Sequence, residues 1–300
     1  MPTGSPRDID FDFGRWVNER RGQAARRARE GAAYAYSGDR AVARTLKAAR
    51  PVTLAIEATV RLWKSVARAD LLGSAVKVTD QQFPRLYAVA ARCAEALQIP
   101  VPAVYVSPSI ASLNAHTLGT EEDAVVVVNA ALVDHLSDDE LAFVIGHECG
   151  HLQNDHVVLN TALHYLTNAA AFYVRWIVQP AVLALNAWSR RAEITCDRAG
   201  LLCVRDPAIA EAALVKLALG SHKLYKELKV EEYVKQLEDG RRGVGRMAEM
   251  FRSHPYLPKR LEALRTFQAS KFFQHWVGAE ADGLDAEACD AKVAQILSVF

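Results

Sequence analysis

The sequence predicts an α+β fold that is mostly helical, with a small sheet packed beside one buried helix. Three observations support this prediction. Apolar residues recur at helical intervals along most of the chain. Three short segments between residues 103 and 129 are bounded by turn-forming residues and have a strand pattern instead. A capped apolar helix then follows the last of these strands, and 300 residues are enough to bury a substantial core.

The individual elements follow from the same patterns. A helical period runs from Val52 to Leu72, and residues 81–99 form an amphipathic pattern with Pro84 near its start. Strands are expected at 103–107, 112–119 and 124–129, the first and last of them rich in valine. The next helix should begin after Ser137, because Glu140 three residues later completes a capping box. Further helices are expected at 157–185, 192–204, 209–219, 230–251, 259–267 and 286–299.

Composition divides the chain into three expected parts: a polar, arginine-rich segment at 1–45, a central domain at 46–270 and a helical extension at 271–300. The arginines between residues 15 and 30 have helical spacing, which indicates a solvated helix face. The alternative interpretation is that these arginines contact a membrane surface or nucleic acid. The formal net charge of the whole chain is only +1, which argues against a dedicated nucleic-acid-binding protein.

Cysteine usage and the N-terminus predict a location in the cytoplasm or at the cytoplasmic face of a membrane. The five cysteines contain no CxxC pair, a pattern that fits a reducing compartment. The first residues lack the basic and apolar regions of a signal peptide. Residues 157–186 are apolar but include Arg175 and Pro180, so buried helices are expected there. Peripheral or partial association of this segment with a membrane is the alternative interpretation.

The segment FVIGHECGHLQNDH predicts a metal centre. His147 and His151 are four residues apart on the expected helix, so both imidazoles face one way and can bind one ion. Glu148 projects about 100° from His147, where it can deprotonate a metal-activated water without binding the metal itself. Zinc suits imidazole and carboxylate ligands with one coordination position left open.

A third ligand is expected downstream, because the nearby alternatives fail on geometry. His156 lies about 140° from His151 on a continued helix and should point away, and Cys149 should face the core. Glu193 and Asp197 are four residues apart on another expected helix, so one can bind zinc while the other orients a ligating histidine. A solvated acidic face is the alternative, and spacing alone does not decide between the two. Cys196 and Cys203 flank Asp197 without metal-ligand spacing, which indicates core packing.

These motifs together resemble the metallopeptidase family of the HtpX-type bacterial proteases and the CAAX prenyl proteases. QQFPRLY, NAHTLG, VVVNAALVDHLSDDELAFVIGHECGHLQNDH, SRRAEITCDRAG and SHPYLPKRLEAL occur in the family's order between Val78 and Leu264. The resemblance implies a zincin-like (gluzincin) fold with one Zn²⁺ per chain. The roles that it implies are zinc ligands at His147, His151 and Glu193, a general base at Glu148, and a supporting carboxylate at Asp197.

The resemblance also implies roles for three residues outside the two motifs. Asn114 resembles the family asparagine at the substrate-binding edge strand, and His254 resembles the histidine that helps to stabilise the oxyanion. Arg260 is expected to be structural. His116-Thr117 departs from the family's usual phenylalanine and small residue, so His116 is expected either to alter substrate fit or to act as a fourth ligand.

The predicted function is a zinc-dependent endopeptidase that acts on a protein or peptide bound in extended form along the edge strand. The alternative is a catalytically silent or self-inhibited zinc-containing member of the same fold that acts as a chaperone or adaptor. In the self-inhibited version, His116, the N-terminal forty residues or the region of Cys149 would block the cleft.

Overall fold

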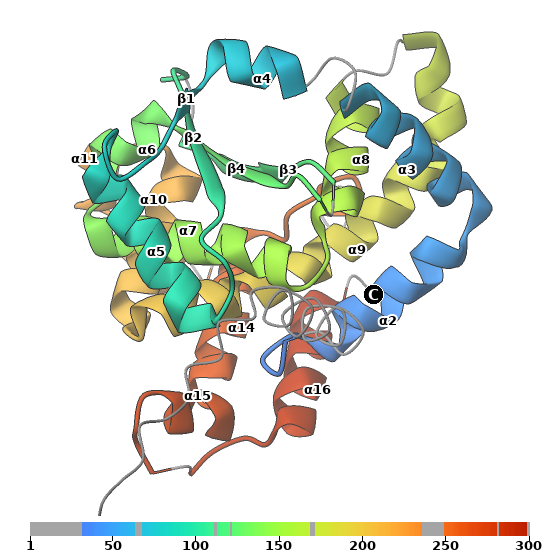
Figure 1. The fold of residues 1–300 in the computed structure, drawn as a ribbon. Helices are drawn as coiled ribbons and strands as arrows, with labels where there is room; N and C mark the ends of the chain where they lie inside the picture. Colours follow the sequence, from blue (N-terminus) through green and yellow to red (C-terminus); the bar gives the residue numbers. More distant parts are fainter. Residues whose placement is uncertain are drawn as a thin grey trace, which may run out of the picture.

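The computed structural model describes residues 32–63, 68–110, 113–120, 122–168, 172–233, 235, 249–280 and 282–298. Its strands are β1 Val76–Lys77, β2 Ala103–Ser107, β3 Ala115–Leu118 and β4 Val125–Asn129. Its helices, shown in Figure 1, are α2 Ser37–Ala48, α3 Arg50–Leu62, α4 Arg68–Ser74, α5 Pro84–Leu97, α6 Ala130–His135, α7 Asp138–Gln153, α8 Val157–Asn168, α9 Phe172–Val204, α10 Pro207–Leu219, α11 His222–Tyr225, α14 Leu257–Gln268, α15 Lys271–Trp276 and α16 Ala286–Leu297.

The four described strands form one mixed sheet in the order β1-β2-β4-β3. β2 and β4 run parallel, while β1 and β3 pair antiparallel with their neighbours. The valines of β4 are buried at the centre of the sheet, and β3 forms an edge that contacts both α7 and α8. The edge strand and the helix with the His-Glu-x-x-His motif are therefore neighbours (Figure 1).

Helix α7 begins at the predicted capping box. The Ser137 hydroxyl accepts a hydrogen bond from the Glu140 backbone N–H at 3.3 Å, and the Glu140 carboxylate accepts one from the Ser137 N–H at 2.9 Å. Every residue from Glu140 to His151 is buried. All faces of this part of the helix are therefore buried. Because buried polar groups need hydrogen-bond partners, its polar side chains depend on the elements packed around it.

Helices α7 and α9 approach each other closely because glycines line their contact. A Cβ atom on Gly150 would lie 3.0 Å from the Cα atom of Cys196 and 2.9 Å from the Cβ atom of Ala199. A Cβ atom on Gly200 would lie 2.7 Å from the Phe143 carbonyl oxygen. Larger residues at these positions would force the helices apart.

The structure confirms a mostly helical α+β fold and corrects several details. All three expected strands are present, whereas the two-residue β1 was not predicted. The helix expected at 192–204 is the end of α9, which begins at Phe172 and contains Pro180. Much of the helix expected at 230–251 lies outside the described residues, as does the arginine-rich patch at 15–30.

The division of the chain at residues 45 and 270 stays a prediction, as does its cellular location. Helix α2 crosses the first boundary and packs on α9, while α16 packs on both α14 and α2 (Figure 1). In the part of the chain that the structure describes, no helix combines the length and apolarity needed to cross a membrane.

We expect Gly150→Ala to lower the free energy of unfolding. Alanine favours a helix over glycine by about 1 kcal/mol, but overpacking a tight contact costs roughly 1–3 kcal/mol. The matched control is Gly73→Ala in α4, where an added Cβ atom meets nothing within 4 Å. Urea denaturation should show Gly150→Ala destabilised and Gly73→Ala unchanged or more stable. Equal effects of the two substitutions would contradict the close contact.

Candidate metal centre

His147 and His151 project from the same face of α7 into a buried space. Their side chains are almost fully buried, and their rings meet edge to face with centroids 5.1 Å apart. Burial lowers the pKa of His151 below its ordinary value, which keeps this imidazole neutral. Burial alone would also lower the pKa of His147, but the neighbouring carboxylates of Glu193 and Asp197 raise it.

Glu193, on α9, faces both imidazoles. Its Oε2 atom lies 3.6 Å from Nε2 of His147, and its Oε1 atom lies 3.6 Å from Nε2 of His151. Glu193 is buried, and its Oε2 atom has no hydrogen-bond partner among the described residues. Burial would raise the pKa of Glu193, but His254, His147 and Arg260 hold it well below the ordinary value, so the side chain is ionised.

Asp197 lies one helical turn after Glu193 and contacts the Nδ1 side of the His147 imidazole. Its Oδ1 atom is 3.0 Å from Nδ1 of His147. Arg260 donates two hydrogen bonds to the same carboxylate, from Nε to Oδ2 at 2.8 Å and from Nη2 to Oδ1 at 2.6 Å. Burial would raise the pKa of Asp197, but this guanidinium lowers it. The carboxylate therefore stays charged and accepts the Nδ1 proton of His147, which leaves Nε2 free to bind an ion.

The three groups fit a divalent cation. Ligands placed 2.0–2.2 Å from a tetrahedral zinc lie about 3.3–3.6 Å from each other, and each of the two Nε2 atoms lies 3.6 Å from one oxygen of Glu193. The buried Oε2 atom lies 3.4 Å from Nη1 of Arg260 but accepts no hydrogen bond, and a cation would satisfy it. The Sγ atom of Cys196 also lies near the imidazoles, because Cys196, His147 and His151 offer ligand atoms within 4.8 Å of one another. The core-packing prediction for Cys196 thus missed its position beside this centre.

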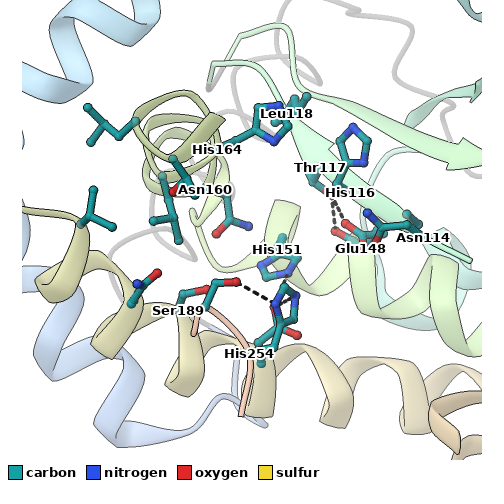
Figure 2. Close-up of a pocket in the computed structure, with 18 of the residues that line it drawn as sticks. Asn114, His116, Thr117, Leu118, Glu148, His151, Asn160, His164, Ser189 and His254 are labelled. Carbon is teal, nitrogen blue, oxygen red and sulfur yellow. Dashed lines mark hydrogen bonds and ion pairs between the residues drawn. The ribbon is translucent and has the colours of Figure 1, made fainter. Parts of the chain in front are cut away.

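Glu148 lies beside the two histidines and is held by the edge strand. The Thr117 hydroxyl donates a hydrogen bond to Oε2 of Glu148 at 2.6 Å, and both side chains are buried. Figure 2 shows this contact between β3 and α7. Although His116-Thr117 departs from the family pattern, its contact with Glu148 could not be predicted, because nothing in the sequence indicates which side of β3 faces α7.

Two pockets meet at His147, which lines both of them. One, of about 500 Å³, is bordered by β3, α8 and α9 and includes His116 and Asn160 (Figure 2). The other, of about 340 Å³, has both polar residues and apolar ones such as Phe143 and Leu214 in its lining. His147, Glu148, Glu193, Asn114 and His254 line both. The candidate centre therefore lies where the two pockets join.

The remaining predicted site residues border the same cleft. Asn114 immediately precedes β3, and its carbonyl accepts a hydrogen bond from the Asn129 N–H at 3.0 Å. His254 is exposed, with its Nε2 atom 3.5 Å from Oε1 of Glu193 and its Nδ1 atom 2.8 Å from the Ser253 hydroxyl. His116 stacks on His164 with ring centroids 5.8 Å apart, and burial lowers the pKa of both imidazoles.

The prediction that His156 points away from His151 is wrong. Helix α7 ends at Gln153, and Asp155 adopts a left-handed conformation with φ of 59°. This turn brings His156 back against the helix, where it is buried with its Nδ1 atom 3.1 Å from Nδ1 of His151. The expectation failed because it projected His156 onto a helix that has already ended. Cys149, by contrast, is buried in the main core as predicted.

Comparison with known proteins supports the same chemistry. A sequence profile of peptidase family M48 matches residues 80–268. The chain is 35% identical over 169 residues to the chloroplastic plastoglobule-localized metallopeptidase 48 of Arabidopsis thaliana, a match that covers 55% of this chain but only 49% of that relative. It is 27% identical to a protease HtpX homolog of Thermococcus kodakarensis, covering 63% of this chain and 75% of the relative. No solved structure matches the chain.

A buried His-Glu-x-x-His helix that faces a carboxylate beside an edge strand, together with these relatives, defines the class: a metallopeptidase. The matched profile covers more than half of the sequence. The chain belongs to peptidase family M48, as the motifs indicated.

We expect Arg260→Gln to reduce stability strongly. The substitution leaves the buried carboxylate of Asp197 without its guanidinium, and breaking a buried pair in this way costs about 3–5 kcal/mol. The matched control is Arg265→Gln on the same helix, whose partners Glu211 and Glu231 are more exposed, with an expected cost of about 0–1 kcal/mol. Urea denaturation at pH 7 measures both; losses of the same size would argue against the role of Arg260.

Proposed function

We propose that this chain is a zinc-dependent endopeptidase with a zincin-like fold. The observation that carries the proposal is the position of the buried Glu193 carboxylate. Its Oε2 atom, which accepts no hydrogen bond, faces Nε2 of His147, while Oε1 faces Nε2 of His151. Two imidazoles and one carboxylate form the ligand set of a catalytic zinc site that keeps a position open for water and substrate.

We assign the third ligand to Glu193 rather than to Cys196. Burial, followed by the nearby carboxylates, raises the pKa of the Cys196 thiol well above its ordinary value, whereas zinc binds a thiolate. Glu193 is already ionised and already faces both Nε2 atoms. Asp197 holds His147 through Nδ1 and supports the ligand without binding the ion.

The side chains around this set divide the work of hydrolysis. Bound zinc would supply a Lewis acid that acidifies water and polarises the scissile carbonyl. Glu148 takes the proton from the attacking water and later passes it to the leaving amine. The Thr117 hydroxyl fixes the orientation of the Glu148 carboxylate, and His254, at the open side of the cleft, donates to the carbonyl oxygen as negative charge develops on it.

The substrate is expected to bind in extended form beside β3. This strand pairs with β4 along one side, and its residues Ala115 to Leu118 line the larger pocket on the way to Glu148. A peptide added to this edge would pair with backbone groups of β3 and present its side chains to the two pockets. Asn114 immediately precedes β3 and lines both pockets, and it is proposed to bind the substrate.

The chaperone or adaptor alternative gains no specific support from the geometry. His116 stacks on His164 of α8 with ring centroids 5.8 Å apart, and no contact of its imidazole with His147 or His151 is seen among the described residues. Of the N-terminal forty residues, one of the candidate blocking segments, the first 31 lie outside the described residues. The presence of a complete set of candidate catalytic side chains in an open cleft favours the enzyme.

We expect Glu148→Gln to reduce hydrolysis of a quenched fluorescent casein by at least about 100-fold, because the amide cannot act as a base. Bound zinc, measured by mass spectrometry of the purified protein, should stay at the level of the original chain. The exposed Glu95→Gln is the control and should retain full activity. Unchanged turnover by Glu148→Gln would rule out the proposed mechanism.

A second pair of substitutions identifies the third ligand. Glu193→Gln should lose most of its zinc on dialysis, because it removes the only carboxylate that faces both Nε2 atoms among the described residues. Cys196→Ser should retain it. Circular dichroism checks that both variants fold. Zinc loss in Cys196→Ser together with retention in Glu193→Gln would assign the thiol as the ligand instead.

A further inference from the structure

The two candidate histidine ligands are supported in different ways. Nδ1 of His147 contacts a carboxylate directly, at Asp197. Nδ1 of His151 lies 3.1 Å from Nδ1 of a second imidazole, His156. Because each of these two nitrogens is either a donor or an acceptor, a hydrogen bond between them requires a proton on only one. The tautomer of His156 therefore decides the tautomer of His151.

A buried carboxylate on the other side of His156 decides that tautomer in turn. Nε2 of His156 lies 2.9 Å from Oδ2 of Asp39. Asp39 is fully buried and accepts two further hydrogen bonds, from Trp188 Nε1 to Oδ1 at 2.9 Å and from Thr195 Oγ1 to Oδ2 at 2.8 Å. Burial would raise the pKa of Asp39, but His156 and these donors lower it, so the group is an ionised acceptor.

We propose that Asp39 and His156 are positioning residues that hold His151 in its metal-binding tautomer. An ionised Asp39 requires a proton on Nε2 of His156, and in the neutral imidazole this leaves Nδ1 of His156 as an acceptor. That acceptor places the proton of neutral His151 on Nδ1. The lone pair of His151 then lies on Nε2, the atom that faces Glu193. The proposal rests on the proposed function, in which His151 binds zinc.

The contacts from Asp39 through His156 to His151, called the relay below, extend the candidate centre into the N-terminal helix α2. Asp39 lies on α2, before residue 80, where the match to the family profile begins. Trp188 packs edge to face on His156 with ring centroids 5.3 Å apart, so the imidazole is confined as well as hydrogen bonded. The Cys196 thiol lies 3.7 Å from Nδ1 of His156, but S–H is only a weak donor, and the imidazole of His151 is closer.

The test compares two carboxylates that attach α2 to the rest of the chain. Asp39→Asn places an amide beside His156, and we expect zinc affinity to fall by about 10- to 100-fold, the usual effect of losing an outer-shell partner. Asp290→Asn is the matched control, because Asp290 accepts from the Ser37 N–H and from Arg198 without contacting His156. Its zinc affinity should stay within about threefold of the original, well short of an outer-shell loss. Competition with a chromophoric zinc chelator measures both variants of the full chain.

A second measurement reads the tautomers directly and needs no variant. Long-range ¹H–¹⁵N spectra of histidine-labelled, metal-free protein should show His156 protonated at Nε2 and His151 at Nδ1. A loss of affinity in Asp39→Asn alone, with these tautomers, supports the relay. Unchanged zinc affinity in Asp39→Asn, or the opposite tautomer at His156, overturns it while leaving the proposed function intact. If the original chain binds no zinc, the proposed function fails and the spectra still decide the tautomers.

Discussion

The close contact between α7 and α9 is the constraint on which the candidate centre depends. Glutamate and aspartate are short side chains, so Glu193 and Asp197 can contact the imidazoles of α7 only if the two helices nearly touch. Glycines on both helices allow this approach, and an added Cβ atom at Gly150 or Gly200 would come within 3.0 Å of backbone atoms. Metal sites tolerate distance errors of only about 0.2 Å, so even a small increase in helix separation would matter.

The second constraint is the charge that this contact buries. Each buried carboxylate costs several kcal/mol of desolvation unless it is paired and hydrogen bonded. Asp197 meets that requirement through the two hydrogen bonds from Arg260, contributed by α14. Glu193 meets it only in part, since its Oε2 atom lies 3.4 Å from Nη1 of Arg260 but accepts no hydrogen bond. The protein chain thus satisfies the supporting carboxylate and leaves the candidate ligand incomplete, an arrangement suited to a cation.

Periodicity and capping predicted the helix of the motif, the strands and the pair of acids, because each depends on residues close in sequence. Spacing also showed that Glu193 and Asp197 share a face, but not which helix that face meets. The contacts that were missed join distant segments: Asp39 with His156, and Thr117 with Glu148. No local pattern specifies such pairs. His156 was placed wrongly for a local reason, because the left-handed Asp155 turns the chain back after α7.

The position of Asp39 changes how the N-terminal region should be regarded. A polar segment that ends at residue 45 could be treated as separable and as a candidate inhibitor of the cleft. Yet α2 carries a fully buried carboxylate that contacts His156, Thr195 and Trp188 beside the candidate centre. Removing forty residues would take away this carboxylate together with any blocking segment. A truncation that tests self-inhibition must therefore end before Ala32, where the described structure begins.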